Sequence, residues 1–495
     1  MKEAHQSHLS VSTHSRRAQG LALLYGAQIL LFFIASHGFA QSAPVVPDHP
    51  WHSAAEQGTE QSAIRQQKPA VTIDPSVTYS LSDLIGFAEA HNPDTRVAWQ
   101  QAEAQAAALG VARSDLYPTL AAAAIANALR FQIYFINRFY RQTIGTFQLS
   151  VDLNYTVFDF GARAGRIDAA KAQLLAANFG FNDVHRQLIF RVSETFYQLL
   201  NAIGQVDAAR ASLANAQTVQ QDAEARLNNG LATLPDVLLA RSATAQDEYA
   251  LQAALGAEDV AHGDLATALG VSPTATIQVT TMEQVPDSIE DTVDQAIDRA
   301  FRQRPDLMSQ IEQIRAADAR LKQAHAAYYP TLTVQAMPEA QSLYGMQQTM
   351  PWGHTADLDG TATLQLNWTL FDGGARKNRV AQAQADVRTA QAQADATRDQ
   401  IENQIWTAYS NLKTAFRQRQ AAASLLVAAS QSYDAAIDSY HYGVRSLLDV
   451  TAAQQTLAQA RSADVLARAQ VLTALADLAF QTGDSIQPAA RRPQP

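Results

Sequence analysis

Phe158-Asp159-Phe160-Gly161-Ala162-Arg163 and Phe371-Asp372-Gly373-Gly374-Ala375-Arg376 are two short stretches of the same chemistry, and they decide the fold. Each begins where an alternating apolar and polar segment ends, and each leads into a long helical pattern. The second starts 213 residues after the first. A strand-to-helix joint that occurs twice indicates an internal repeat.

Four further landmarks recur in the same order at nearly the same offset. They are Asn92-Pro93-Asp94 with Arg304-Pro305-Asp306, Tyr117-Pro118-Thr119-Leu120 with Tyr329-Pro330-Thr331-Leu332, the segment 230–237 with 443–450, and Gly270 with Gly483. The sequence therefore predicts two similar units, repeat 1 at 81–283 and repeat 2 at 284–484.

Composition excludes several classes of function. The net charge of −10 over 495 residues argues against a nucleic-acid partner. The absence of cysteine rules out disulfides, thiolate metal sites, a cysteine nucleophile and a lipid anchor on cysteine. No phosphate-binding loop, zinc-protease motif, nucleophile elbow or dinucleotide fingerprint occurs in the sequence. We therefore expect neither an enzyme nor a cofactor.

The N-terminus has the pattern of a secretory signal peptide over 1–40. Arg16 and Arg17 precede an apolar run at 21–35, and Gly38-Phe39-Ala40 forms a small-x-small cleavage site. A membrane anchor is the alternative, although the run is short for a spanning helix. Residues 41–80 are predicted to be a flexible linker, and residues 485–495 a disordered tail.

Two strands are predicted in each repeat, at 119–131 and 145–158 and at 331–341 and 360–371. The second strand of each pair alternates strictly, for example Leu149, Val151 and Leu153 with Ser150 and Asp152. Such alternation fits a membrane strand with lipid on one face, or an ordinary antiparallel strand with one wet face. No other segment has the apolar run of a transmembrane helix, so the membrane interpretation requires a β-barrel.

Long connections are expected between the paired strands. The first connection is rich in aromatic residues, which could form an interface girdle or pack within the loop: Phe131, Tyr134, Phe135, Phe139 and Tyr140. The second holds Pro338, Gly345, Pro351, Trp352 and Gly353.

After each joint the hydrophobic period changes to that of a helix. Apolar residues fall at alternating spacings of three and four from Ile189 to Val206 and from Ile401 to Ala415. These patterns predict long helical hairpins at 160–270 and 373–482. An uninterrupted helix of nearly seventy residues would be about 100 Å long, at roughly 1.5 Å per residue.

The joints themselves are predicted to bring the chain from one environment to another. Phe158 and Phe371 would end the strands at an interface depth that suits aromatic rings. Asp159 and Asp372 are candidate helix caps. Glycines at 161, 373 and 374 would allow a sharp change of direction.

Paired strands, a long helical hairpin, and the same again resemble the TolC-like outer-membrane efflux protein family. The resemblance covers residues 80–484 and rests on the F-D-x-G-x-R joints, the Y-P-T-L strand entries and the two glycine-to-Asp-Val turns. It implies a mainly α protein that forms a homotrimer. Each chain would give four strands to a 12-stranded outer-membrane β-barrel, which helices continue as a periplasmic α-barrel.

The resemblance also implies residue roles at the two helical turns. Tyr440 and Arg445 would be inter-helix links of a gate, Asp236 their partner, and Asp449 a threefold ring of acid facing the pore. Docking of a periplasmic adaptor would use Gly230, Leu231, Leu234, Gly443, Val444 and Leu447. The sequence departs from the family pattern at Ala452 and Pro235. The alternative is that these residues only build the turns or are solvated.

These implications predict the exit duct of a tripartite efflux system, with a periplasmic adaptor and an inner-membrane pump as partners. Its location would be the outer membrane, with a long periplasmic extension and no lipid anchor. The sequence leaves the substrate open. A duct for type I protein secretion remains an alternative, as does a coiled-coil envelope protein without a pore.

Overall fold

The computed structural model describes residues 59, 62, 72–281, 292–347 and 351–484. The predicted signal peptide, most of the predicted linker, the boundary between 283 and 284, and the tail at 485–495 lie outside these residues. Every element below belongs to the compact unit formed by residues 71–495.

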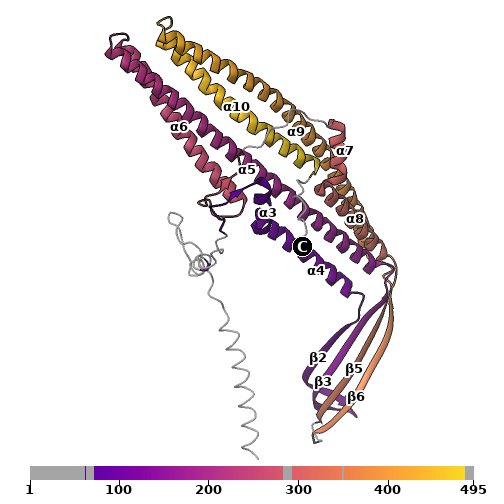
Figure 1. The fold of residues 1–495 in the computed structure, drawn as a ribbon. Coiled ribbons are helices and arrows are strands. Elements are labelled where there is room, and N and C mark those ends of the chain that lie inside the picture. Colours follow the sequence, from indigo (N-terminus) through magenta and orange to yellow (C-terminus); the bar gives the residue numbers. More distant parts are fainter. Residues whose placement is uncertain (1–58, 60–61, 63–71, 282–291, 348–350, 485–495) are drawn as a thin grey trace, which may run out of the picture. The chain divides into compact units, whose positions relative to one another are not determined.

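The internal repeat is visible in the order and length of the elements (Figure 1). Repeat 1 contains α3 (Leu81–His91), α4 (Pro93–Ser114), β2 (Thr119–Phe135), β3 (Arg138–Phe158), α5 (Ala162–Asn228) and α6 (Leu234–Ala268). Repeat 2 contains α7 (Val293–Gln303), α8 (Pro305–Ala326), β5 (Thr331–Gln347), β6 (Gly353–Asn367), α9 (Ala375–His441) and α10 (Leu447–Thr482). Both long helices, α5 and α9, have 67 residues. The duplicated strand-pair and helix-hairpin architecture is therefore confirmed.

The four long strands form one antiparallel sheet in the order β2-β3-β5-β6. They are 17, 21, 17 and 15 residues long. The prediction of a long aromatic-rich connection in repeat 1 is wrong, because β2 and β3 extend through it and meet at a two-residue turn. At that turn Ile136 and Asn137 have positive φ angles of 46° and 60°.

Repeat 2 departs from the sequence prediction in a related way. Pro338 and Gly345 belong to β5 and Gly353 begins β6, so most of the predicted connection is strand. β6 ends at Asn367, four residues before Phe371, so the predicted strand end at 371 is also wrong. Trp368 leaves the strand direction, and its indole Nε1 donates to the carbonyl oxygen of Tyr328 at 3.1 Å.

Strand register separates an apolar face of the sheet from a polar one. Leu366 of β6 lies opposite Leu332 of β5, and Gln365 lies opposite Thr333. The same alternation places Leu149 and Val151 on one face of β3 and Ser150 on the other.

The apolar side chains of the sheet are exposed in this chain, and Leu358, Leu364 and Leu366 are 82%, 67% and 64% accessible. A sheet with an uncovered apolar face needs another apolar phase or another chain beside it.

The long helices pack as two antiparallel hairpins, α5 with α6 and α9 with α10, and α10 also lies against α5. The predicted heptad seams are buried, since Val192, Leu199 and Val206 of α5 and Ile401 and Ile405 of α9 are at most 1% exposed. Among the described residues, no helix combines the length and the apolarity that crossing a membrane requires.

The helices that precede each strand pair break at a proline in both repeats. α3 ends at His91 and α4 begins with Pro93, whose missing N–H is tolerated in the first helical turn.

The flexible linker predicted at 41–80 extends too far toward the C-terminus. Ile73 is buried in the core around α3 and α5, and β1 (Thr78–Tyr79) pairs in parallel with β4 (Gln278–Val279). Burial of Ile73 and this pairing fix the end of the segment predicted to be flexible.

Candidate gate at the two hairpin tips

Both helical hairpins turn through the same backbone motif. In the first, the N–H of Leu231 donates to the carbonyl of Arg226 at 2.8 Å, and that of Gly230 donates to Leu227 at 3.0 Å. In the second, Val444 and Gly443 make the equivalent bonds to Ser439 and Tyr440. The glycines have φ angles of 71° and 73°, which only glycine adopts without strain. Gly230 and Gly443 therefore terminate helices.

Each returning helix begins with a capping box. The Oδ2 atom of Asp236 accepts from the N–H of Thr233 at 2.9 Å and from its hydroxyl at 2.7 Å. Asp449 accepts in the same way from Ser446, at 3.1 and 2.9 Å. These side-chain and main-chain hydrogen bonds lower the pKa of both aspartates below the usual value of 3.8. Both carboxylates are therefore ionised at neutral pH and bound to their own turns.

The predicted tip residues divide into exposed and buried groups. Leu231, Leu234 and Val444 are 75%, 59% and 77% exposed, as a docking surface requires. Leu447 is only 1% exposed, so its predicted role as an exposed docking residue is wrong. It is the first residue of α10 and packs with Val450 and Tyr440 in a core shared by both hairpins.

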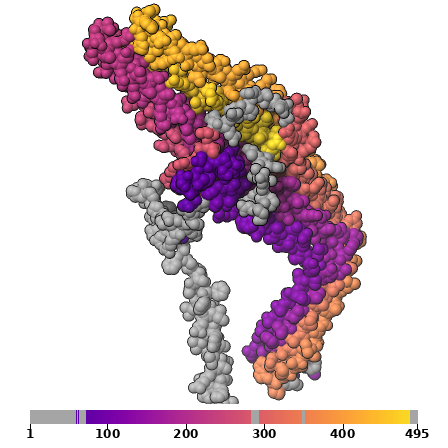
Figure 2. Space-filling model, viewed as in Figure 1, coloured from indigo at the N-terminus to yellow at the C-terminus, as the bar shows by residue number. Residues whose placement is uncertain are grey.

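A cross-hairpin tie joins the two tips, and apart from Tyr440 it involves residues that no sequence pattern indicated. A guanidinium nitrogen of Arg226 on α5 donates to the carbonyl of His441 on α9 at 2.9 Å. The same guanidinium lies 4.5 Å from the ring centre of Tyr440 and 3.3 Å from Asp222. Nε2 of His441 lies 3.4 Å from Asp222. Figure 2 shows the two tips side by side.

Tyr440 is the one predicted gate residue inside this tie. It is 8% exposed, and burial raises the pKa of its hydroxyl, an effect that the charge of Arg226 opposes. The hydroxyl has no hydrogen-bond partner among the described residues. A buried hydroxyl without a partner is costly, and the packing of the tyrosine ring must offset that cost.

The other predicted links do not form within the chain. Arg445 is exposed, and no hydrogen bond or ion pair of the described residues joins it to Asp236 or Tyr440. A second contact between hairpins lies further along instead, where Nε2 of Gln454 on α10 donates to Asp247 on α6 at 3.0 Å. Burial raises the pKa of Asp247, and this hydrogen bond partly offsets the effect.

Sequence differences between the two repeats at equivalent positions could have revealed the tie. Arg226 and Asp222 correspond by the repeat offset to Ser439 and Ala435, and Tyr440 corresponds to Leu227. Matching glycines and aspartates show how the turns are built. Mismatched side chains beside them show where one hairpin contacts the other.

The two strand-to-helix joints are nearly identical in geometry. Oδ2 of Asp159 accepts from the main-chain N–H of Arg163 at 2.8 Å and from its Nε at 3.1 Å. Asp372 accepts from Arg376 at 3.0 and 2.9 Å. Each aspartate therefore caps the first turn of the following helix and pairs with an arginine of that turn.

Positive φ angles turn the chain at both joints. Gly161 and Gly374 have φ angles of 91° and 88°. The preceding positions, Phe160 and Gly373, have φ angles of 51° and 66°. Phe160 is thus a rare aromatic residue in the left-handed region, and its ring stacks on Tyr329 at 4.9 Å.

Comparison with known proteins gives a consistent family. A family model described as outer membrane efflux protein matches residues 84–271 and 296–484, one segment in each repeat. Protein CyaE of Bordetella pertussis is 29% identical over 402 residues, covering 81% of this chain and 83% of that protein. Outer membrane protein OprJ of Pseudomonas aeruginosa is 24% identical, covering 87% and 90% of the two chains.

Solved structures show the same fold. The outer-membrane channel OprN superposes with a TM-score of 0.73 at 19% identity, covering 85% of this chain and 97% of that one. The outer membrane protein VceC of Vibrio cholerae gives a TM-score of 0.69 at 19% identity, covering 81% and 96%.

Proposed function

Because the chain belongs to the outer membrane efflux protein family, we propose that it is the exit duct of a tripartite efflux system, gated at its hairpin tips. In this proposal three copies form the duct, which spans the outer membrane and extends into the periplasm. A periplasmic adaptor and an inner-membrane pump deliver the substrate to it.

The open sheet is the observation that carries the proposal. Among the described strands, β2 and β6 each have one neighbour only, so each leaves a row of main-chain N–H and C=O groups without a strand partner there. Hydrocarbon offers those groups no partner, and closure of the sheet by further copies would pair them all. The exposed apolar face of the same strands supports lipid as its surroundings.

Strand length is consistent with a sheet that extends beyond the bilayer. A tilted membrane strand needs roughly 9–11 residues. The strands here have 15 to 21 residues, so about a third or more of each would project out of the hydrocarbon. The tight turn between β2 and β3 would then lie at the distal end of that projection.

The tip geometry supports a gate whose closed state depends on polar contacts as well as on a shared apolar core. The Arg226 tie and the Gln454–Asp247 hydrogen bond connect the hairpins of one chain. The exposed guanidinium of Arg445 would bond to a neighbouring copy when the duct is closed. A few such bonds separate two states by a few kcal/mol, which a partner's binding energy could overcome.

The exposed apolar residues at the tips support docking of the adaptor there. Leu231, Leu234 and Val444 face solvent beside the two turns, whereas Leu447 belongs to the core. An adaptor that covers the three exposed side chains would contact both hairpins at once. The tips would thus combine the gate with the surface through which a partner opens it.

Planar-bilayer recordings of the purified full-length protein test the proposal. We expect a heat-modifiable trimer from the outer-membrane fraction with small single-channel conductance. The double variant Arg445→Ser with Tyr440→Phe should conduct more, because the bond of Arg445 to a neighbouring copy is lost. A monomer in the soluble fraction, or a membrane-inserted trimer without conductance, would contradict the proposal.

Ion preference tests the remaining gate residue. Asp449 would contribute a ring of three carboxylates at the constriction, which attracts cations. Asp449→Asn should therefore move the reversal potential in a salt gradient toward that of an unselective pore. An unchanged reversal potential would limit Asp449 to its hydrogen bonds with Ser446.

A further inference from the structure

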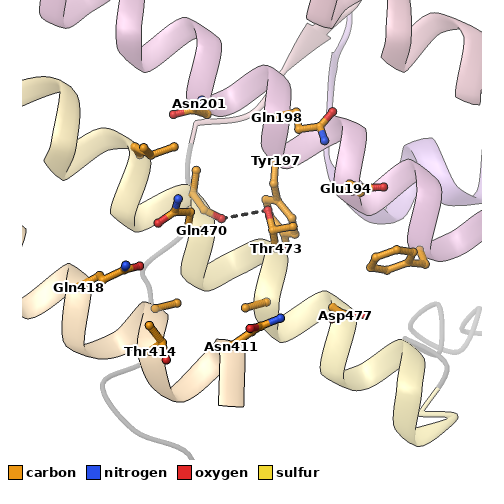
Figure 3. A pocket seen from close by; sticks show the side chains of 15 residues that line it. Glu194, Tyr197, Gln198, Asn201, Asn411, Thr414, Gln418, Gln470, Thr473 and Asp477 are labelled. Carbon is orange, nitrogen blue, oxygen red and sulfur yellow. Dashed lines mark hydrogen bonds between the residues drawn. The ribbon is translucent and has the colours of Figure 1, made fainter. Parts of the chain in front are cut away.

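A groove of about 600 Å³ lies between three of the long helices, far along them from both tips and both joints. Figure 3 shows Glu194 and Tyr197 entering it from α5, Gln470 and Asp477 from α10, and Asn411 from α9. The volume is within the range of roughly 300–1,000 Å³ found for small-molecule sites. Helices from both repeats form its walls.

The lining has a negative charge that no side chain of the groove balances. Glu194 and Asp477 are its two carboxylates, and no lysine, arginine or histidine is among the lining residues. Glu194 forms no ion pair or hydrogen bond with any described residue. Within the described part of the chain, Asp477 accepts only from Nε2 of Gln481, at 3.0 Å. Burial raises the pKa of Asp477, which shows how poorly its negative charge is solvated there.

Aromatic and amide groups complete the groove. Phe190 is held in place by stacking on Phe480, with ring centres 4.7 Å apart, and Tyr197 lies about two helical turns further along α5. Aromatic faces attract cations, most strongly where water is partly excluded. Five amide side chains add carbonyl acceptors: Gln198, Asn201, Asn411, Gln418 and Gln470.

We propose that this groove binds an organic cation with an apolar or aromatic body. The two carboxylates would pair with its positive charge, the rings would cover its apolar part, and the amides would accept from its N–H groups. A bare metal ion is disfavoured, because no group of three or more potential ligands able to hold one occurs among the described residues. An anion would meet two carboxylates and no cation.

The inference rests on the proposed function, since it makes the groove a binding site for cationic substrates in the wall of the duct. It does not depend on the gate or on the adaptor. A neighbouring copy that covers the groove in the trimer is the competing occupant, and the same experiment separates the two.

Equilibrium dialysis of the detergent-solubilised full-length trimer tests the proposal with ethidium as the cationic probe and fluorescein as an anion of similar size. We expect saturable binding of ethidium and none of fluorescein. Asp477→Asn combined with Glu194→Gln should weaken ethidium binding at least tenfold. Asp259→Asn, a change of an exposed acid on α6, is the control and should leave it unchanged.

Three results would overturn the proposal: equal binding of both dyes, equal ethidium binding in the double variant and the control, or no ethidium binding at all, as expected if a second copy fills the groove. Conductance is recorded on the same preparations. A conducting trimer that does not bind ethidium would contradict binding in the groove but not the function as a duct. Ethidium binding without conductance contradicts the duct instead.

Discussion

The two joints and the two tips are both duplicated, yet the joints have stayed alike while the tips have diverged. At the joints, Asp159 and Asp372 make the same bonds to Arg163 and Arg376, with distances that agree within 0.2 Å. At the tips, the turns agree but the side chains beside them do not. Arg226 of the first hairpin contacts Tyr440 of the second.

The difference follows from what each region contacts. A joint satisfies its own hydrogen bonds locally, so one solution serves both repeats. A tip packs against the other tip, and two identical surfaces with the same charge would repel. One hairpin therefore supplies Arg226 and Asp222, and the other supplies Tyr440 and His441. At the tips, these positions at which the two repeats differ in sequence are therefore positions at which they contact each other.

The largest expected effect is at the joint. Asp159→Ala removes the cap and leaves Arg163, whose side chain is 15% exposed, without its carboxylate. Breaking such a buried pair costs about 3 kcal/mol. We expect a lower melting temperature and less assembled trimer, by circular dichroism and unheated gel electrophoresis.

Asp372→Ala should have the same kind of effect, since Arg376 is 11% exposed. Asp207→Ala is the matched control, because its pair with Arg210 is more than half exposed and should contribute little. If Asp372→Ala behaved like this control while Asp159→Ala did not, the two joints would not be equivalent.

The next largest effect is expected at the tip, where a substitution should change how often the channel opens more than it changes the stability of the fold. Arg226→Gln removes the contact with Tyr440 and the charged hydrogen bond to His441, together about 1–2 kcal/mol. If the closed state loses that amount, its ratio to the open state falls by roughly 5- to 30-fold. Single-channel recordings should show more frequent opening.

Arg210→Gln provides the comparison on the same helix, in an exposed ion pair that does not join the hairpins. Its recordings should match those of the unaltered protein. Equal opening in both variants would mean that the Arg226 tie holds one chain together without holding the duct closed.

Much of the fold could be predicted from sequence because the decisive signals are local. Proline at 93 and glycines at 230 and 443 act on their own backbone, and the heptad seams need only their own helix.

The positions at which strands end were harder to predict. Sequence alone assigns Phe131 and Tyr134 to a loop, because a membrane strand needs only about ten residues. The pairing of β2 with β3 continues to the turn. The preferences of single residues do not show how far along the chain such pairing extends.

The candidate site was predictable only where it builds a turn. Glycine and aspartate at the tips have recognisable local roles, whereas the turn position of Leu447 wrongly predicts a surface residue. Leu447 is buried because α9 and α10 meet there with the first hairpin, a contact between distant parts of the chain. The tie between Arg226 and Tyr440 depends on the same long-range contact.

An effect of similar size should separate the conformational from the chemical role of the joint glycines. Gly161→Ala and Gly374→Ala force alanine to φ angles near 90°, which costs about 1–2 kcal/mol each. Gly180→Ala within α5 is the matched control, because nothing lies within 4 Å of the added methyl group. It should stabilise the helix by about 0.5–1 kcal/mol. Thermal denaturation would show opposite signs, and the same sign at 161 and 180 would contradict the argument.

The smallest effect distinguishes the tips from the middle of α5 by pH. Hydrogen bonds from Thr233 and Ser446 hold the pKa values of Asp236 and Asp449 below 3.8. A lowered folded-state pKa contributes stability above pH 3.8, and that contribution is lost as the pH falls through the lowered value. The tips should therefore loosen only in strong acid, while neutral pH leaves both capping boxes intact.

Hydrogen-exchange protection factors of the tip segments, compared between about pH 6 and about pH 3, measure this loss. Protection at the two turns should fall a few-fold more than in the middle of α5, because the first turns of α6 and α10 are held by titrating carboxylates and the middle of α5 is not. Asp236→Asn should abolish the extra fall at the first tip alone, since asparagine does not titrate, and Asp449→Asn at the second alone. Asp259→Asn should abolish neither. If one substitution removed the fall at both tips, the capping boxes would be coupled through the Arg226 tie rather than acting separately, and the tips would titrate as one unit.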